Sequence, residues 1–217
     1  MSVASAESSG AVLLRKTLVY RACRASVWTY LHLRHRMRVE GLEHLPRQGG
    51  ALIVANHQSF LDIPLLAAAT SRHISFVARK SLADSALLGF IMRQCGAVLI
   101  QRGAPDRAAL REMQEHLQGG DLLAIFPEGT RTSDGSVGEF KAGALLAARK
   151  AGVPLIPAGI RGSFQVWPRS RSRPGPGRMA VRFQPPVDVS RPGALEAVRG
   201  AVLEAVGDGS FAGKPPA

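Results

Sequence analysis

"GALIVANHQSFLDIPLLAAAT", residues 50–70, contains the pattern from which the fold can be predicted. Residues 50–56 form a short apolar run, which is typical of a strand buried in a sheet. Asp62 then opens "DIPLLAAAT", which indicates a helix because Asp is a favoured N-cap and proline is tolerated in the first turn. The stretch therefore predicts a buried strand that leads, through a short loop, into a helix.

The same alternation continues along the chain. Further short strands are expected at 73–80, 96–102, 121–129 and 153–160, helices at 104–118 and 139–151, and a last strand at 179–189 after a basic Pro/Gly-rich loop at 168–178. This order predicts an α/β fold, a single domain with a largely parallel or mixed central sheet flanked by helices, preceded by an N-terminal basic helix. A length of 217 residues suits one such domain. We expect a helical membrane-surface segment over 1–38, the α/β domain over 39–205 and a disordered tail over 206–217.

Charge and cysteine content narrow the classes of partner. The chain has 28 Lys and Arg against 16 Asp and Glu, a net charge of +12, which favours an anionic partner such as nucleic acid, an anionic membrane or a phosphorylated substrate. Because the chain shows no helix-turn-helix signature, zinc spacing or aromatic RNA-binding motif, we expect no nucleic-acid partner. Cys23 and Cys95 lie far apart, so neither a disulfide framework nor a paired-cysteine metal site is expected, and a reducing compartment fits.

Residues 11–38 carry seven Arg or Lys and no acidic residue. Leu14, Leu18, Ala25 and Trp28 share one side of a helix there, and a basic helix with Trp can lie on an anionic membrane surface. The alternative is a helix packed on its own domain with a solvated basic edge. No stretch reaches the roughly 18 uninterrupted apolar residues of a spanning helix. We therefore expect the cytoplasmic face of the cell membrane, with peripheral or monotopic attachment.

His57 directly follows the strand at 50–56, so it should lie where parallel strands end and where α/β proteins bind ligands. A loop from His57 to Asp62 can fold back and bring the carboxylate to the imidazole. That contact would set the tautomer and leave the other ring nitrogen available as a base. The alternative keeps Asp62 as a helix cap and His57 as an ordinary loop residue.

A second motif, "FPEGTRTSDG", residues 126–135, follows another expected strand. A turn at Gly129 exposes backbone N–H groups, and Arg131 supplies a planar fork suited to phosphate. Arg102, at the end of the strand at 96–102, is a further cation. Arginines at strand ends are often merely solvated, but with the net charge they indicate a phosphate-bearing acceptor beside a base.

"NHQSFLD", "GAVLIQRG", "FPEGTRT" and "VPLIPAGI" resemble, in order and rough spacing, the four sequence blocks of the glycerolipid acyltransferase family. The chain is most similar to the bacterial 1-acylglycerol-3-phosphate acyltransferases, over roughly residues 39–187. One departure is Gln101, where family members often have an acid before the arginine of the second block.

This resemblance implies transfer of an acyl group from acyl-CoA or acyl-carrier protein to the sn-2 hydroxyl of 1-acyl-sn-glycerol 3-phosphate, giving phosphatidate in phospholipid biosynthesis. It implies that His57 is the base and Asp62 its orienting carboxylate, with no cofactor, no metal and no acyl-enzyme. Ser59 and Cys95 are therefore not expected to be nucleophiles; Ser59 should support the turn. The residues similar to those that hold the glycerol phosphate are Arg102, Glu128, Gly129, Thr130 and Arg131, with Lys80 or Arg79 adding charge.

Two other functions remain open at this point. Gln101 leaves room for an O-acyltransferase that acts on another lyso-lipid, such as lyso-ornithine lipid. A lipid-binding protein without catalysis would keep the basic helix, but it would not need His57 and Asp62 together. The oxyanion stabiliser that acyl transfer requires is not identified by the sequence.

Overall fold

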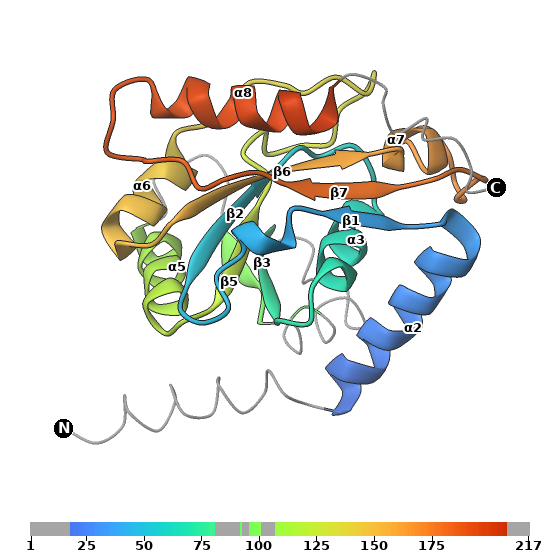
Figure 1. Ribbon diagram of the computed structural model, residues 1–217, viewed down its shortest axis with the longest axis horizontal. Helices are drawn as coiled ribbons and strands as arrows, with labels where there is room; N and C mark the ends of the chain where they lie inside the picture. The colour runs from blue at the N-terminus through green and yellow to red at the C-terminus, as the bar shows by residue number, and fades with distance from the viewer. Residues whose placement is uncertain (1–17, 81–91, 93–95, 101–106, 208–217) are drawn as a thin grey trace.

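The computed structural model of the chain describes residues 18–80, 92, 96–100 and 107–207. Its centre is a seven-stranded sheet with the order β1-β7-β6-β2-β5-β3-β4 (Figure 1). The strands are β1 (Arg38–Glu40), β2 (Ala51–Ala55), β3 (Ile74–Arg79), β4 (Val98–Ile100), β5 (Leu122–Ile125), β6 (Leu155–Arg161) and β7 (Ala180–Phe183). Strand β2 pairs in parallel with β5 and β6, β3 pairs in parallel with β5 and β4, and β7 is antiparallel to β6. The predicted α/β fold with a mixed sheet is confirmed.

Helices cover both faces of this sheet. The first face carries α2 (Leu18–His35) and α3 (Asp62–Ala69), and the second carries α5 (Arg107–Gln118), α6 (Gly143–Ala151) and α8 (Ala194–Val206). Figure 1 shows α2 and α8 on opposite sides of the strands. Two short helices, η1 (Leu42–His44) and α7 (Ser163–Val166), lie in connections.

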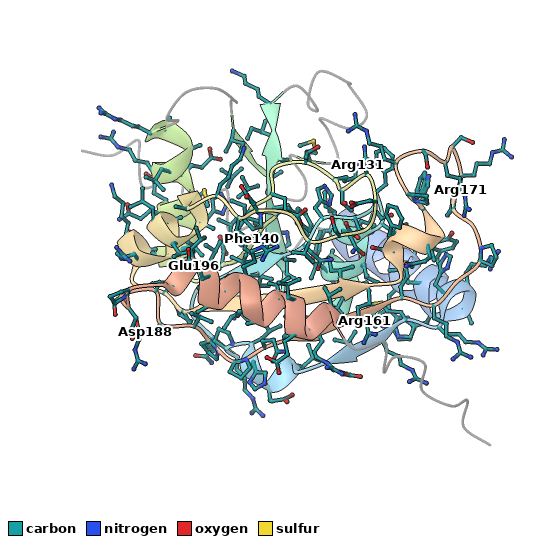
Figure 2. The ribbon with its side chains drawn as sticks, turned by 90° about the horizontal axis from the view of Figure 1, so that it is seen from above. Arg131, Phe140, Arg161, Arg171, Asp188 and Glu196 are labelled. Atoms are coloured by element: carbon teal, nitrogen blue, oxygen red, sulfur yellow. The ribbon has the colours of Figure 1, made fainter. Side chains whose placement is uncertain are left out.

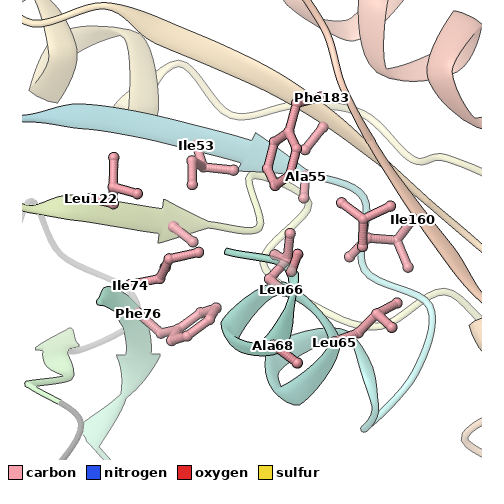
Figure 3. Packing of buried hydrophobic residues seen from close by; sticks show 14 of the residues in the cluster. Ile53, Ala55, Leu65, Leu66, Ala68, Ile74, Phe76, Leu122, Ile160 and Phe183 are labelled. Atoms are coloured by element: carbon pink, nitrogen blue, oxygen red, sulfur yellow. The ribbon is translucent and has the colours of Figure 1, made fainter. Parts of the chain in front are cut away.

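Strand β2 shows why the apolar run is continuous. Ile53 and Ala55 pack on the first face, whereas Leu52 and Val54 pack on the second, because successive side chains of a strand point to opposite sides. All are fully buried. Figure 3 shows Ile53 and Ala55 beside Leu66 of α3. A strand covered on both faces needs apolar residues at every position, which is the pattern in the sequence.

Three features differ from the sequence-based expectations. The last strand is short, since β7 ends at Phe183 and is followed within three residues by Pro185 and Pro186, which cannot donate to a sheet ladder. The helix expected from residue 139 begins at Gly143. Strand β1 and helix α8 were not predicted at all.

Helix α2 packs against α3, with Leu31 fully buried in the core of the first face. Arg38 already lies in β1, so the chain enters the sheet at the end of the proposed N-terminal segment. The division into segments at residue 38 stays a prediction. No helix in the described part of the chain is both long enough and apolar enough to cross a membrane.

Candidate active site

His57 and Asp62 lie at the carboxyl edge of the sheet, just beyond β2 and at the start of α3. The His57 Nδ1 atom is 2.9 Å from Asp62 Oδ2. The Asp62 side chain is fully buried, and the His57 side chain is 18% exposed. With Nδ1–H donating to the carboxylate, Nε2 is the ring nitrogen left to accept a proton. The predicted contact is present in the structure.

Asp62 also shapes the turn that makes this contact possible. Its Oδ2 atom accepts the backbone N–H groups of Gln58, at 2.6 Å, and Ser59, at 2.7 Å. The N-cap of α3 is Leu61, and no side chain caps this helix end. The expectation that Asp62 is the N-cap is therefore wrong: its carboxylate is used by the preceding turn. The turn brings a carboxylate five positions away back onto the imidazole.

Ser59 supports the same turn, as predicted. Its Oγ atom accepts the N–H of Leu61 at 3.1 Å and donates to the carbonyl oxygen of Trp167 at 2.8 Å. Both partners are backbone groups, and Ser59 is fully buried. These contacts are those of a structural hydroxyl that anchors the turn to the segment after α7.

The loop after β5 holds His57 from the other side. Since β2 and β5 are parallel neighbours, the segments that follow them emerge at the same edge. The His57 N–H donates to Glu128 Oε1 at 2.8 Å, and the His57 carbonyl accepts the N–H of Thr132 at 2.9 Å. The Phe126 ring stacks on the imidazole, with centroids 4.1 Å apart and an interplanar angle of 17°. His57 is therefore held at its backbone and at one face of its ring.

Glu128 bridges two parts of the site. Its Oε1 atom accepts from His57, as above, and its Oε2 atom accepts the N–H of Gly138 at 3.3 Å. Burial raises the pKa of the Glu128 carboxyl above its ordinary value. The two hydrogen bonds lower this pKa, but their effect is smaller than that of burial. Contact between Glu128 and a glycerol phosphate stays a prediction. The contacts in the structure make it a positioning residue for His57.

The remaining members of the third block follow a tight turn. Gly129 has φ of 71°, and its N–H donates to the Phe126 carbonyl at 3.0 Å. The Arg131 guanidinium carbon lies 3.5 Å from the centre of the Phe60 ring, so this cation is held beside the His57 turn. Thr130 is exposed.

Of the two other predicted phosphate ligands, Lys80 lies within the described residues and Arg102 does not. Lys80 is exposed and directly follows β3, whose carboxyl end lies at the same edge of the sheet as those of β2 and β5. Arg102, the Arg79 side chain and Cys95 lie outside the described residues. Their predicted roles are unchanged.

Asn56 is a residue of the site that the sequence analysis missed. Its side chain is fully buried, donates from Nδ2 to the Ile160 carbonyl at 3.0 Å and accepts the Ile160 N–H at Oδ1 at 2.7 Å. It thereby ties the end of β2 to the end of β6, one residue before His57. A polar amide that ends a buried apolar run is the signal that could have identified it, because buried amides need partners.

Comparisons with known proteins give a consistent family. The Acyltransferase family model matches residues 36–161, which include His57, Asp62, Glu128 and Arg131. The chain is 34% identical over 149 residues to the 1-acyl-sn-glycerol-3-phosphate acyltransferase LPAT1, chloroplastic, of Arabidopsis thaliana, covering 66% of this chain and 42% of that protein. It is 28% identical over 145 residues to the 1-acyl-sn-glycerol-3-phosphate acyltransferase of Bacillus subtilis, covering 66% and 72%.

A solved structure supports the same assignment. The crystal structure of the 1-acyl-sn-glycerophosphate (LPA) acyltransferase PlsC from Thermotoga maritima matches with a TM-score of 0.71 and 32% identity, over 91% of this chain and 81% of that one. The chain spans less than half the length of the Arabidopsis relative. The family match covers more than half of the 217 residues. The chain therefore belongs to the Acyltransferase family.

Proposed function

We propose that the protein transfers a fatty acyl group from acyl-CoA or acyl-carrier protein to the sn-2 hydroxyl of 1-acyl-sn-glycerol 3-phosphate, producing phosphatidate. The observation that carries this proposal is the 2.9 Å contact between His57 Nδ1 and the fully buried Asp62. The names of the similar proteins from Arabidopsis, Bacillus and Thermotoga support the choice of acceptor.

The chemistry follows from the free ring nitrogen. His57 Nε2 takes the proton from the acceptor hydroxyl as its oxygen attacks the thioester carbonyl. The carbon–sulfur bond then breaks, and the departing thiolate receives the proton from the imidazolium. Asp62 stabilises the charge on the ring while the proton resides there. The acyl group passes directly from sulfur to oxygen, so Ser59 is not acylated and no cofactor is required.

The acceptor phosphate is proposed to lie against Arg131, with Lys80, Arg102, Gly129 and Thr130 as further contacts. A guanidinium supplies two parallel N–H groups to a phosphate, which fixes orientation as well as binding energy. The stacking of Arg131 on Phe60 supports this role, because it restricts the side chain before substrate arrives.

Attachment to the cytoplasmic face of an anionic membrane, as a peripheral or monotopic protein, is part of the proposal. Helix α2 exposes Trp28 (46%) and Leu33 (82%), and Arg21 and Arg34 are exposed on the same helix. Apolar side chains among cations are typical of a helix at a lipid interface. Arg24 of the same helix donates to the Thr70 carbonyl at 3.1 Å, so this cation is bound within the protein.

A panel assay tests the proposal. Purified protein is supplied with radiolabelled acyl-CoA or acyl-carrier protein and, in turn, lysophosphatidate, other lyso-phospholipids and lyso-ornithine lipid. We expect phosphatidate as the main product, and no product from the His57→Ala variant. Preferential acylation of lyso-ornithine lipid would identify the alternative enzyme. Failure to acylate any lyso-lipid would refute the proposed function.

A further inference from the structure

A cavity of about 450 Å³ opens beside the site, at the edge of the sheet where β6 ends. Its walls include Arg36, Arg38, Arg161 and Arg178, which we call the arginine cavity. None of the described residues that line it is acidic. Figure 2 shows Arg161 near the C-terminal end of α8, well apart from Arg131. The cavity is therefore distinct from the proposed acceptor contacts.

Strand register explains how these arginines meet. Ala180 of β7 pairs with Arg161 of β6 on one side and with Arg38 of β1 on the other. Paired residues of neighbouring strands point to the same face, so the two guanidinium groups flank Ala180. Arg36 and Arg178 lie just before β1 and β7, and both line the same cavity as Arg38 and Arg161.

The arrangement is held by a close backbone contact. Gly162 has φ of 76°, and a Cβ atom there would lie 1.9 Å from the Arg178 carbonyl oxygen. The segment that carries Arg178 is thus pressed onto the end of β6, next to Arg161. Arg36 adopts φ of 46°, and it alone among the described non-glycine residues has a positive φ. Such conformations concentrate at functional sites.

Three of the four arginines that line the cavity have no charged partner among the described residues. The side chains of Arg36, Arg38 and Arg178 are exposed and form no ion pair or hydrogen bond with any described residue. Glu40 in β1, an acid near this row, is bonded to Arg182 at 2.7 Å. Closely spaced cations without counter-ions repel one another, and an anionic ligand would relieve that repulsion.

We propose that the arginine cavity binds the phosphate groups of the nucleotide part of acyl-CoA, an inference that rests on the proposed acyl transfer. Coenzyme A carries a diphosphate and a 3′-phosphate close together, whereas the acceptor has a single phosphate ester. A cluster of four arginines fits the more highly charged partner. The volume also lies within the roughly 300–1,000 Å³ range of small-molecule sites.

The position of the cavity fits a donor site. Gln58, which directly follows His57, lines the cavity together with Gly135 of the loop after β5. The Gln58 Nε2 atom donates to the Gly135 carbonyl at 2.7 Å, so the two blocks that hold the base also form a wall of the cavity. A nucleotide bound there lies next to the site, and its flexible pantetheine arm can carry the thioester to His57.

Binding of coenzyme A itself is the first test, because it does not depend on turnover. The full-length protein is titrated calorimetrically at low salt with coenzyme A and with 3′-dephospho-coenzyme A. The Arg38→Gln/Arg178→Gln double variant should bind coenzyme A about tenfold or more weakly, since a hydrogen bond to a charged group is worth roughly that factor. Wild type should prefer coenzyme A to the dephospho form, and the double variant should lose most of this preference.

The matched control is Arg107→Gln/Arg111→Gln, which removes the same charge from two exposed residues of α5. It should bind like wild type. Thermal unfolding checks that each variant is folded, and the single variants Arg38→Gln and Arg178→Gln serve if the double variant is not. Steady-state kinetics should show a raised KM for acyl-CoA in the cavity variants, with the KM for lysophosphatidate unchanged.

Several outcomes would overturn the inference. Equal weakening in both double variants would reflect net charge, and unchanged binding in the cavity variants would exclude the cavity. Use of acyl-carrier protein alone, without coenzyme A binding, would leave the proposed function intact and refute the donor site. Reduced flotation with anionic vesicles in the cavity variants only, with unchanged coenzyme A binding, would assign the cavity to the lipid surface. Cavity-dependent coenzyme A binding without acyl transfer would support the site and refute the proposed function.

Discussion

Arg131 lies over Phe60, with its guanidinium carbon 3.5 Å from the ring centre. The contact joins the turn that contains His57 to the loop after β5, so a residue of the His57 turn positions a proposed phosphate ligand. The Phe60 ring packs in turn against Trp167, with centroids 5.2 Å apart. Because Phe60 is 52% exposed, its main contribution is to orientation rather than to the core.

The contact between Arg131 and Phe60 predicts that substitutions at these residues raise the KM for the acceptor more than the KM for the acyl donor. Arg131→Ala should raise the KM for the phosphorylated acceptor, because it removes a charged contact worth about 1.5–3 kcal/mol of binding energy. Arg102→Ala should act in the same direction. Phe60→Leu should have a smaller effect on the same constant, about 0.5–1 kcal/mol, because it removes only the stacking. Phe60→Tyr keeps the ring and serves as control. Equal changes in the KM for donor and acceptor would indicate a structural role instead.

Catalysis should depend most strongly on His57. His57→Ala should lower kcat by about 10²–10⁴-fold, the usual effect of removing a general base, without loss of the fold. Asp62→Asn should cost less in rate, although it also weakens a turn in which Oδ2 accepts two backbone N–H groups. Initial rates and circular dichroism measure both effects. A folded His57→Ala protein with more than about a tenth of wild-type activity would rule out this assignment.

The buried carboxyl of Glu128 predicts a pH effect on stability. Its pKa is raised above the ordinary value of 4.5, so the folded state holds this proton more tightly than the unfolded chain does. The contribution of Glu128 to the free energy of unfolding should therefore fall as pH rises from about 4.5 through the native pKa. Urea unfolding of wild type and Glu128→Gln at successive pH values gives the difference between the two proteins.

That difference, wild type minus variant, should decrease over the stated window. Glu139→Gln, which removes an exposed carboxyl from the same loop, is the matched control. An increase over the window would mean that the hydrogen bonds from His57 and Gly138 outweigh the desolvation of Glu128.

Substituting two glycines that share a backbone conformation distinguishes the cost of backbone strain from the cost of a steric clash. Gly162 has φ of 76° and Gly193 has φ of 75°, but a Cβ atom would lie 1.9 Å from the Arg178 carbonyl at Gly162 and would meet nothing within 4 Å at Gly193. Gly193→Ala should cost only about 1–2 kcal/mol, the penalty of the left-handed conformation. Gly162→Ala should cost clearly more and should weaken coenzyme A binding. Similar unfolding midpoints for the two variants would contradict the close contact.

Membrane attachment should depend on the exposed side of α2. Deleting the whole segment would also remove the buried Leu31, so point variants are the better probe. Trp28→Ser/Leu33→Ser should lower vesicle partitioning by about tenfold or more, given the apolar area involved. Leu203→Ser, on the exposed side of α8, is the control. High salt should loosen the wild-type protein without releasing it entirely. Unchanged flotation of the α2 variant would indicate that this helix packs on its own domain and does not bind the membrane.

The sequence alone is sufficient to predict the features that depend on short-range order. The apolar run that forms β2 and the helix start at Asp62 are readable because burial and periodicity act within a few residues. The His57–Asp62 contact follows from the same local turn, aided by the family resemblance. Helix α8 was equally accessible, since Ala194, Val198 and Val202 recur at a helical spacing and are buried.

The tertiary structure decides whatever depends on which strands are neighbours. The phosphate role that the family resemblance implies for Glu128 stays a prediction, but only the fold shows that its carboxylate accepts the N–H of His57, a residue 71 positions away. Arg38 and Arg161 become neighbours only because β7 lies between β1 and β6 and pairs with both. Hydropathy patterns specify that a strand is buried, but they do not encode its partner or its direction. Pairing is settled by long-range packing of the whole sheet, and the arginine cavity exists only once that packing is complete.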